Sequence, residues 1–293
     1  MRRYALFTGC LIYQRVPHIE AVSVEVLKRL GVEFKRLDGF TCCPEPTTMR
    51  VLNKDAWYAL AARNLAVAEE AGLDILTLCN GCNATLFRVA EDLKADGSLR
   101  DKVNKVLAVV GRRFEGGVEV RSLLRVLHED VGADAVKQAV ERPMKGVKVA
   151  VHHGCHIYDE LSHYDDVKRP RVFKDLLRAL GCEVVDYPSE GLCCGAFIRP
   201  ADEELSLSMV KEKIEQVKEL GADCLAVICP TCLIQFDAGQ VMASRKLGVT
   251  LDVPVFYLTQ LIGLAMGMGL DEVGAKYHTI KPSRLAEKLL IKT

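Results

Sequence analysis

Thiol groups are the functional groups whose number and spacing stand out most in this sequence. Ten of its twelve cysteines fall into two sets, each made of a single cysteine, an adjacent pair and a C-x-x-C pair. The members of the first set are Cys10, Cys42, Cys43, Cys79 and Cys82. The members of the second set are Cys155, Cys193, Cys194, Cys229 and Cys232. Thiolates bind metals, and sites built only from thiolates select zinc or iron–sulfur clusters. The two sets therefore indicate two metal centres.

The number of cysteines in each set helps to distinguish between these metals. A mononuclear zinc site takes four ligands, usually from two short pairs, so five cysteines exceed its need. Neighbouring side chains such as Cys42 and Cys43 reach two different metal atoms more easily than they reach one. An iron–sulfur cluster therefore fits better, although an ordinary cubane cluster uses only four cysteines. Zinc in one or both halves stays open as the alternative.

An internal duplication explains why the cysteine pattern occurs twice. ALFTGCLIYQ at 5–14 matches AVHHGCHIYD at 150–159, and LKRLGVEF at 27–34 matches LRALGCEV at 177–184. Each copy then continues with an adjacent cysteine pair and a C-x-x-C pair in the same order. Each half of the chain is therefore expected to be one folding unit with one metal centre.

The boundary between the two copies is expected near a break in the helical pattern. Pro143 and Gly146 interrupt that pattern, which places a first domain at 1–145 and a second domain at 146–293. The first domain is expected to carry an extra helical segment at about 98–141, which lengthens it relative to the second.

Amphipathic patterns alternate with short apolar runs in both copies. Helices are predicted at about 17–31, 53–71 and 82–95, and again at about 166–181, 202–220 and 230–246. The apolar runs between them predict buried parallel strands. The predicted fold is α/β, with two tandem repeats of a Rossmann-like parallel-sheet unit. Ligands bind at the carboxyl ends of the strands in such sheets, and each cysteine group follows a predicted strand. The five thiols of each copy are therefore expected to meet at that edge.

The two remaining cysteines have a structural explanation. Cys182 and Cys224 align with Val32 and Ile75 of the first copy, inside apolar strand patterns. A free cysteine in such a place usually behaves as a small core residue. We expect both to be buried and to take no part in metal binding.

Composition and charge exclude several classes of protein. Of the 293 residues, 49% are hydrophobic and 27% are charged, which is typical of a globular chain with an ample core. Lysine plus arginine and aspartate plus glutamate both total 39, so there is no nucleic-acid footprint. No secretory signal or membrane span is visible, and we expect a cytoplasmic location. Thiols stay reduced there, which argues against a disulfide framework.

The doubled cysteine pattern resembles that of the CCG-domain proteins, a family named for its cysteine-rich motif. Within this family the B subunits of heterodisulfide reductases of methanogenic archaea are the most similar, on the evidence of Cys-Cys-Pro, Cys-Cys-Gly and the CNGC segment. The resemblance implies that each half binds a noncubane [4Fe–4S] cluster through its five cysteines. It also implies that the disulfide of coenzyme M and coenzyme B, a substrate of methanogenesis, is reduced between them to two thiols. One departure is the spacing of 34 residues between Cys194 and Cys229, slightly shorter than the family pattern.

Disulfide reduction also consumes two protons, so proton donors are expected beside the cysteines. His153 and His156 flank Cys155, and Glu45 lies just after the first cysteine pair. These three residues are the candidate catalytic groups, since histidine titrates near neutral pH. For His152 and His153 the alternative is that they end a strand and hydrogen-bond the backbone. For Glu45 it is a solvated loop carboxylate.

The resemblance further implies an acidic substrate and partner proteins. The sulfonate, phosphate and carboxylates of the coenzyme pair predict a basic entrance, for which Arg15, Arg50 and Arg199 are candidates, although each is also typical of a solvated surface. No glycine-rich nucleotide loop is visible, so electrons are expected from a partner. The implied partners are the C and A subunits of heterodisulfide reductase, which carry iron–sulfur and flavin groups, with a hydrogenase or formate dehydrogenase upstream.

Two other functions stay open on the sequence. The chain is alternatively a CCG-domain electron-transfer protein within another oxidoreductase, of the thiol:fumarate, succinate or lactate/glycolate type. A third hypothesis is a zinc-stabilised scaffold without catalytic activity. Two complete cysteine sets favour the reductase, because a pure relay has no need of both.

Overall fold

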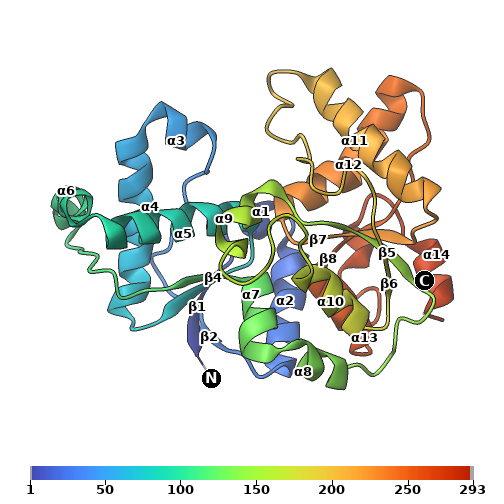
Figure 1. Ribbon diagram of the computed structural model, residues 1–293, viewed down its shortest axis with the longest axis horizontal. Helices are drawn as coiled ribbons and strands as arrows, with labels where there is room; N and C mark the ends of the chain where they lie inside the picture. Colours follow the sequence, from blue (N-terminus) through green and yellow to red (C-terminus); the bar gives the residue numbers. More distant parts are fainter. Residues whose placement is uncertain (1, 291–293) are drawn as a thin grey trace.

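Two four-stranded parallel sheets form the frame of the protein (Figure 1). The computed structural model describes residues 2–290, and the strand orders are β2-β1-β3-β4 and β6-β5-β7-β8. The strands of the first sheet are β1 (Arg3–Phe7), β2 (Glu33–Lys35), β3 (Asp74–Thr77) and β4 (Val120–Ser122). Those of the second are β5 (Lys148–His152), β6 (Glu183–Val185), β7 (Cys224–Val227) and β8 (Val255–Tyr257). Both sheets are parallel throughout and have the same order, which confirms the predicted pair of Rossmann-like units.

Helices connect the successive strands of each unit. The first unit contains α1 (Cys10–Arg15), α2 (Pro17–Arg29), α3 (Thr48–Leu52), α4 (Lys54–Glu70), α5 (Asn80–Ala95), α6 (Gly97–Leu107), α7 (Leu123–Arg125) and α8 (Ala133–Gln138), with a 3₁₀ turn η1 (Ala108–Val110) and a π-helical turn η2 (Val126–Val131). The second contains α9 (Tyr158–Leu161), α10 (Val172–Ala179), α11 (Glu203–Glu219), α12 (Pro230–Leu247), α13 (Leu258–Ala265) and α14 (Ser283–Lys288), with 3₁₀ turns η3 (Cys155–Ile157) and η4 (Ala275–Tyr277).

Local signals explain why the long helices begin where they do. Asn53 and Asp202 precede α4 and α11, and each side chain accepts a hydrogen bond from a backbone N–H of the first turn. This N-capping satisfies donors that have no partner inside the helix. The helix between the second and third strands, α4 in one unit and α11 in the other, therefore begins with the same kind of cap in both units. Pro230 occupies the first position of α12, where its missing N–H costs nothing.

One helix is shorter than its sequence pattern predicts. The pattern indicates a helix over 166–181, whereas α10 begins only at Val172. The carboxylate of Asp165 accepts the backbone N–H groups of Arg171 and Val172, both at 2.8 Å, and so closes a loop in front of the helix. Pro170 also disfavours helical backbone at the preceding residue. The segment from 165 to 171 is consequently a loop that leaves its side chains free to line a cavity.

The extra helical segment of the first unit is shorter than the one predicted at 98–141. β4 and α7 occupy the place that β8 and α13 occupy in the second unit. α6 and η1 lie between α5 and β4 and have no counterpart in the second unit, which crosses directly from α12 to β8. The extra helical segment therefore lies on the side of the first unit, away from the second (Figure 1).

Helices of one unit that pack against helices of the other hold the two units together. α2, the long helix after β1, packs against α13 of the second unit, while α10, after β5, packs against α8 of the first. The hydroxyls of Ser23 on α2 and Thr259 on α13 are fully buried and lie 2.8 Å apart. This hydrogen bond joins residues of the two units inside one continuous core.

The buried hydroxyl pair allows a test of this packing. Ser23→Ala leaves the Thr259 hydroxyl buried without a partner and should lower the free energy of unfolding by about 1–3 kcal/mol. Adding Thr259→Val removes the orphaned hydroxyl as well, so the double variant should recover part of that loss in urea-induced unfolding. A double variant less stable than the sum of the two single variants would contradict the assigned hydrogen bond.

Candidate functional site

Each cysteine set converges at the carboxyl ends of three strands, as the sequence predicts. Cys10 and Cys155 begin α1 and η3 directly after the central strands β1 and β5. The adjacent pairs follow β2 and β6, and the C-x-x-C pairs follow β3 and β7. Cys79 and Cys229 occupy the N-cap positions of α5 and α12. Helix N-termini favour negative charge, so this placement stabilises thiolates.

The five thiols of each set contact one another in a chain. In the first set the order of contacts is Cys10, Cys42, Cys43, Cys82 and Cys79. In the second set the order is Cys155, Cys193, Cys194, Cys232 and Cys229. The Sγ atoms of Cys155 and Cys193 lie 3.9 Å apart. Each set is therefore a compact group of soft donors, which is the ligand chemistry of an iron–sulfur site.

Contacts between thiols separate the pKa values of neighbouring cysteines. The neighbouring thiol of Cys42 lowers the pKa of Cys43 well below its usual value, while Cys43 raises the pKa of Cys42. In the second set, contact with Cys155 lowers the pKa of Cys193, and the pKa of Cys155 rises. Each set thus stabilises a thiolate, the form that binds metal.

A glycine lets the backbone pass close to the thiols at each set. Gly9 and Gly154 precede Cys10 and Cys155 and have φ values of +81° and +79°, which favour glycine. A Cβ on Gly9 would lie 2.8 Å from the Sγ of Cys82, and a Cβ on Gly154 would lie 3.6 Å from the Sγ of Cys232. A larger residue at Gly9 would therefore collide with a thiol of the first set.

The two cysteine sets meet at the boundary between the units. The thiols of Cys79 and Cys229, one from each C-x-x-C pair, lie close enough to one another that each shifts the pKa of the other. Both side chains are buried. The two centres therefore lie next to one another, with the N-termini of α5 and α12 between them.

Buried hydrogen bonds from one unit to the other fix this arrangement. The Asn80 side chain donates to the backbone oxygen of His153 at 2.9 Å. The Tyr257 hydroxyl contacts the backbone oxygens of Leu78 and Ile228, the residues that precede Cys79 and Cys229. The sequence holds no signal for this role of Tyr257, because its partners are backbone atoms of distant segments.

A buried carboxylate makes a second link across the boundary. Glu160 of α9 is fully buried and accepts hydrogen bonds from the Asn83 side chain at 2.8 Å and the Ser122 backbone at 3.0 Å. Its pKa is raised because burial disfavours the charged form, and these hydrogen bonds work against that effect. Glu160 thus ties the loop after Cys155 to the first turn of α5.

The candidate proton donors lie in different environments. His153 is buried, and its Nε2 lies 2.9 Å from the Glu190 carboxylate. The Nε2 of His156 is buried without a hydrogen-bond partner among residues 2–290, and its ring packs edge-on against Phe197. The Glu45 carboxylate accepts the backbone N–H groups of Thr47, Thr48 and Met49, and these bonds lower its pKa although burial opposes them. Glu45 therefore holds the loop after Cys43 in shape.

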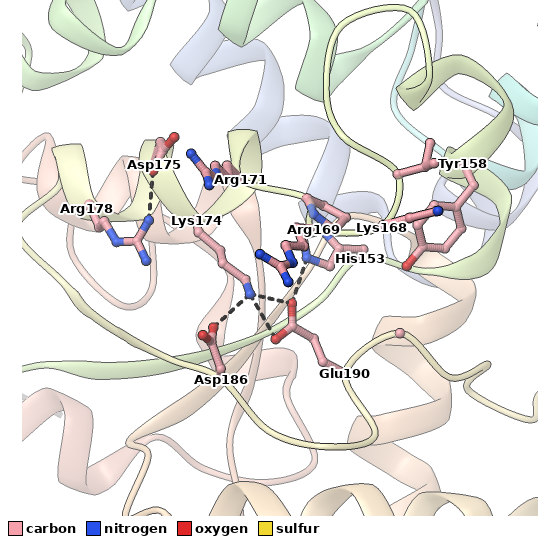
Figure 2. A pocket seen from close by; sticks show the side chains of 13 residues that line it. His153, Tyr158, Lys168, Arg169, Arg171, Lys174, Asp175, Arg178, Asp186 and Glu190 are labelled. Carbon is pink, nitrogen blue, oxygen red and sulfur yellow. Dashed lines mark hydrogen bonds and ion pairs between the residues drawn. The ribbon is translucent and has the colours of Figure 1, made fainter.

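A basic cavity of about 850 Å³ lies beside the second cysteine set (Figure 2). Glu190 lies between the His153 ring and the Lys174 ammonium, in hydrogen-bond contact with the ring and in an ion pair with the ammonium, while Lys174 also pairs with Asp186. The side chains of Lys168, Arg169 and Arg171 line the cavity without a carboxylate partner in the described chain. Gly191 and His153, each two residues from a cysteine of the set, form the inner wall.

The basic residues that the sequence analysis named for the entrance lie outside this cavity. Arg50 lies over the Trp57 ring at 5.5 Å, and the Arg199 guanidinium contacts the Met242 sulfur at 2.9 Å. Neither of these residues, nor Arg15, lines the basic cavity. The KRPR run at 168–171 was the signal that could have identified the cavity, since three cations follow one another in a predicted helix start.

The two cysteines outside the sets occupy the core. Cys182 and Cys224 are buried, and the Cys182 sulfur lies 3.7 Å from that of Met144. Burial raises the pKa of the Cys182 thiol to about 12, so the thiol stays protonated.

The tyrosine that bridges the two centres offers a direct test. Tyr257→Phe leaves the carbonyl groups of Leu78 and Ile228 without this donor and should lower the free energy of unfolding by about 1–3 kcal/mol. The matched control is Tyr277→Phe, which removes the hydroxyl of an exposed tyrosine and should have little effect. Equal stability of the two variants in urea would contradict the role assigned to Tyr257.

Comparison with known proteins agrees with the geometry. The cysteine-rich domain (CCG) profile matches residues 4–87 and 149–237, which are the two cysteine-bearing segments. The chain is 34% identical over 99% of its length, and 97% of the relative, to the B subunit of the ferredoxin/F420H2-dependent CoB–CoM heterodisulfide reductase of Methanosarcina acetivorans. It is 30% identical over 97% of its length, and 99% of the relative, to the membrane anchor of the 8-methylmenaquinol:fumarate reductase of Wolinella succinogenes.

A solved structure supports the fold. A hypothetical protein from Helicobacter pylori has a TM-score of 0.75 at 16% identity, covering 96% of this chain and 52% of that one. Among residues 2–290, no helix combines the length and the apolar character needed to cross a membrane. The two matched segments and the full-length similarity to heterodisulfide reductase relatives show that the chain belongs to the CCG cysteine-rich domain family.

Proposed function

We propose that this chain is the catalytic iron–sulfur subunit of a CoB–CoM heterodisulfide reductase, which reduces the disulfide to two thiols at two noncubane [4Fe–4S] clusters. The observation that carries the proposal is that two complete sets of five thiols lie next to one another, with Cys79 and Cys229 as the neighbouring members. A disulfide has two sulfur atoms and takes up two electrons, so a pair of adjacent centres matches its chemistry.

The ten cysteines of the two sets are the proposed ligands. When bound, an iron–sulfur cluster in each set supplies one electron and an iron atom for one sulfur of the substrate. The protein contributes ten soft donors and the helix N-termini that stabilise thiolates.

Histidines of the second unit are the proposed proton donors. The Nε2 of His156 has no hydrogen-bond partner in the described chain, so this buried nitrogen keeps a free hydrogen-bonding position next to Cys155. His153 is held by Glu190 at the wall of the basic cavity and connects that cavity with the loop of Cys155. Glu45 is the least suited of the three candidates, because the backbone already occupies both of its oxygens.

The basic cavity is the proposed place for an acidic part of the substrate. Lys168, Arg169 and Arg171 lack carboxylate partners within residues 2–290, so they can pair with sulfonate, phosphate or carboxylate groups. Its volume of about 850 Å³ suits an extended organic ligand. The inner wall at Gly191 and His153 would then direct the sulfur end of the substrate toward the cysteines.

Electrons would come from partner proteins. For the soluble form of the complex, the proposed partners in the cytoplasm are the iron–sulfur (C) and flavin (A) components of the reductase, with a hydrogenase or formate dehydrogenase upstream. The relative from Wolinella succinogenes supports one alternative, in which the chain transfers electrons in a different oxidoreductase. Turnover of the heterodisulfide, compared with turnover of a quinone, separates the two functions.

Removing one cysteine from each set tests the ligand assignment. Cys43→Ala and Cys194→Ala should each halve the iron content of anaerobically purified protein, from about eight to about four atoms per chain. The control is Cys182→Ala, which removes a buried thiol outside both sets and should leave the iron content unchanged. Unchanged iron and sulfide in both set variants would refute the assignment.

Removing cations from the cavity tests the proposed substrate site. Arg169→Gln and Arg171→Gln should each raise KM for the heterodisulfide by roughly tenfold with little change in kcat, because a charge-assisted contact with the bound substrate is lost. Arg113→Gln is the matched control, since Arg113 is an exposed arginine outside the cavity and its guanidinium already pairs with Glu115. A KM that rises equally in all three variants would show that general surface charge, not the cavity, attracts the substrate.

A further inference from the structure

The two cysteine sets occupy matched positions, but two of the side chains around them differ in kind. Phe7 ends β1 in the first unit, and His152 ends β5 in the second. Asn64 on α4 and Lys213 on α11 are likewise equivalent, because each is ten residues beyond the first residue of its helix. At both positions the first unit has a side chain without charge, and the second has an ionisable one. All four side chains are buried.

His152 points at the second cysteine set. One of its ring nitrogens and the Sγ atoms of Cys194 and Cys232 lie within 4.8 Å of one another. Its side chain is 1% exposed, and neither ring nitrogen has a hydrogen-bond partner among residues 2–290. A buried polar group without a partner is costly, so the N–H of this ring requires an acceptor at the site.

The His152 ring can donate a hydrogen bond to the site, because an imidazole carries an N–H on at least one of its ring nitrogens. The acceptors within reach are the sulfur atoms of the second set and whatever group those sulfurs hold. At the equivalent place in the first unit, the Phe7 ring has no donor and packs against Phe40.

Lys213 brings a positive charge to the same side. Its ammonium donates to the backbone oxygens of Ser189 and Glu190, just before the adjacent cysteine pair, and lies 5.2 Å from the Tyr187 ring centroid. Burial lowers the pKa of Lys213 to about 8, while the thiolates of the second set act to raise it. Asn64 makes the corresponding contact to the backbone oxygen of Cys42 without any charge.

We propose that His152 and Lys213 make the second centre the more easily reduced of the two centres in this chain. Reduction adds one electron, and so one negative charge, to the group that the five thiolates hold, and no bond of the protein forms or breaks. An N–H donor to sulfur and a nearby buried cation both stabilise that added charge. This inference rests on the iron–sulfur centres of the proposed function.

The test is a redox titration of the full, iron-loaded chain with dithionite, followed by EPR. The wild-type protein should show two reduction steps, and Cys194→Ala identifies which signal belongs to the second centre. His152→Phe and Lys213→Asn copy the first unit into the second. Each should lower the ratio of reduced to oxidised second centre at fixed potential by roughly tenfold, equal to about 59 mV for one electron.

Three further variants separate this effect from damage to the fold. His152→Gln keeps an N–H donor and should recover part of the shift. Phe7→His adds a donor to the first unit and should make the first centre easier to reduce. Lys211→Asn removes a partly exposed cation from the same helix and should change neither centre.

The iron and sulfide content of every variant distinguishes the possible failures. Full iron content with unchanged potentials in His152→Phe and Lys213→Asn overturns the inference and leaves the proposed function intact. Equal shifts of both centres also overturn it, because the side chains would then act on the whole chain. Zinc in place of iron in the wild-type protein overturns the inference and the proposed function together.

Discussion

The meeting of two helix N-termini is the constraint on which the rest of the structure depends. α5 and α12 each begin at a C-x-x-C pair, and the first cysteines of these pairs are in contact. This arrangement brings partial positive charge from both helices to the place where ten thiols gather. The parallel sheets support this arrangement, because the carboxyl ends of their strands bring the other cysteine groups to the same edge.

Keeping two such centres side by side demands polar contacts in a buried boundary. Asn80, Tyr257 and Glu160 each reach from one unit to the backbone or side chains of the other. These groups would be costly if left without partners, and their pairing defines one relative position of the two units. The packing of α2 on α13 and of α10 on α8 supplies the apolar part of the same interface. These contacts explain why the two copies of the duplicated chain pack into one continuous structure.

Local sequence patterns predicted most of the strands and helices and the two cysteine sets. They could not predict contacts between segments that are distant in sequence. The grouping of the ten cysteines followed from the repeat and from the strand that precedes each group, and the long helices α4, α11 and α12 follow their amphipathic patterns closely. The start of α10 was missed because the Asp165 side chain, six residues away, closes the loop before it. The bridging role of Tyr257 and the inward position of His152 depend on segments that are distant in sequence, so no periodicity could reveal them.

The most direct test of the account is a map of the anaerobically purified protein that locates its metal atoms, recorded as anomalous scattering at the iron edge. The account predicts two separate groups of several iron atoms, one inside each set of five cysteine sulfurs, next to each other across the contact between Cys79 and Cys229. A single zinc ion in either set, or sulfur atoms that remain without metal, would contradict it.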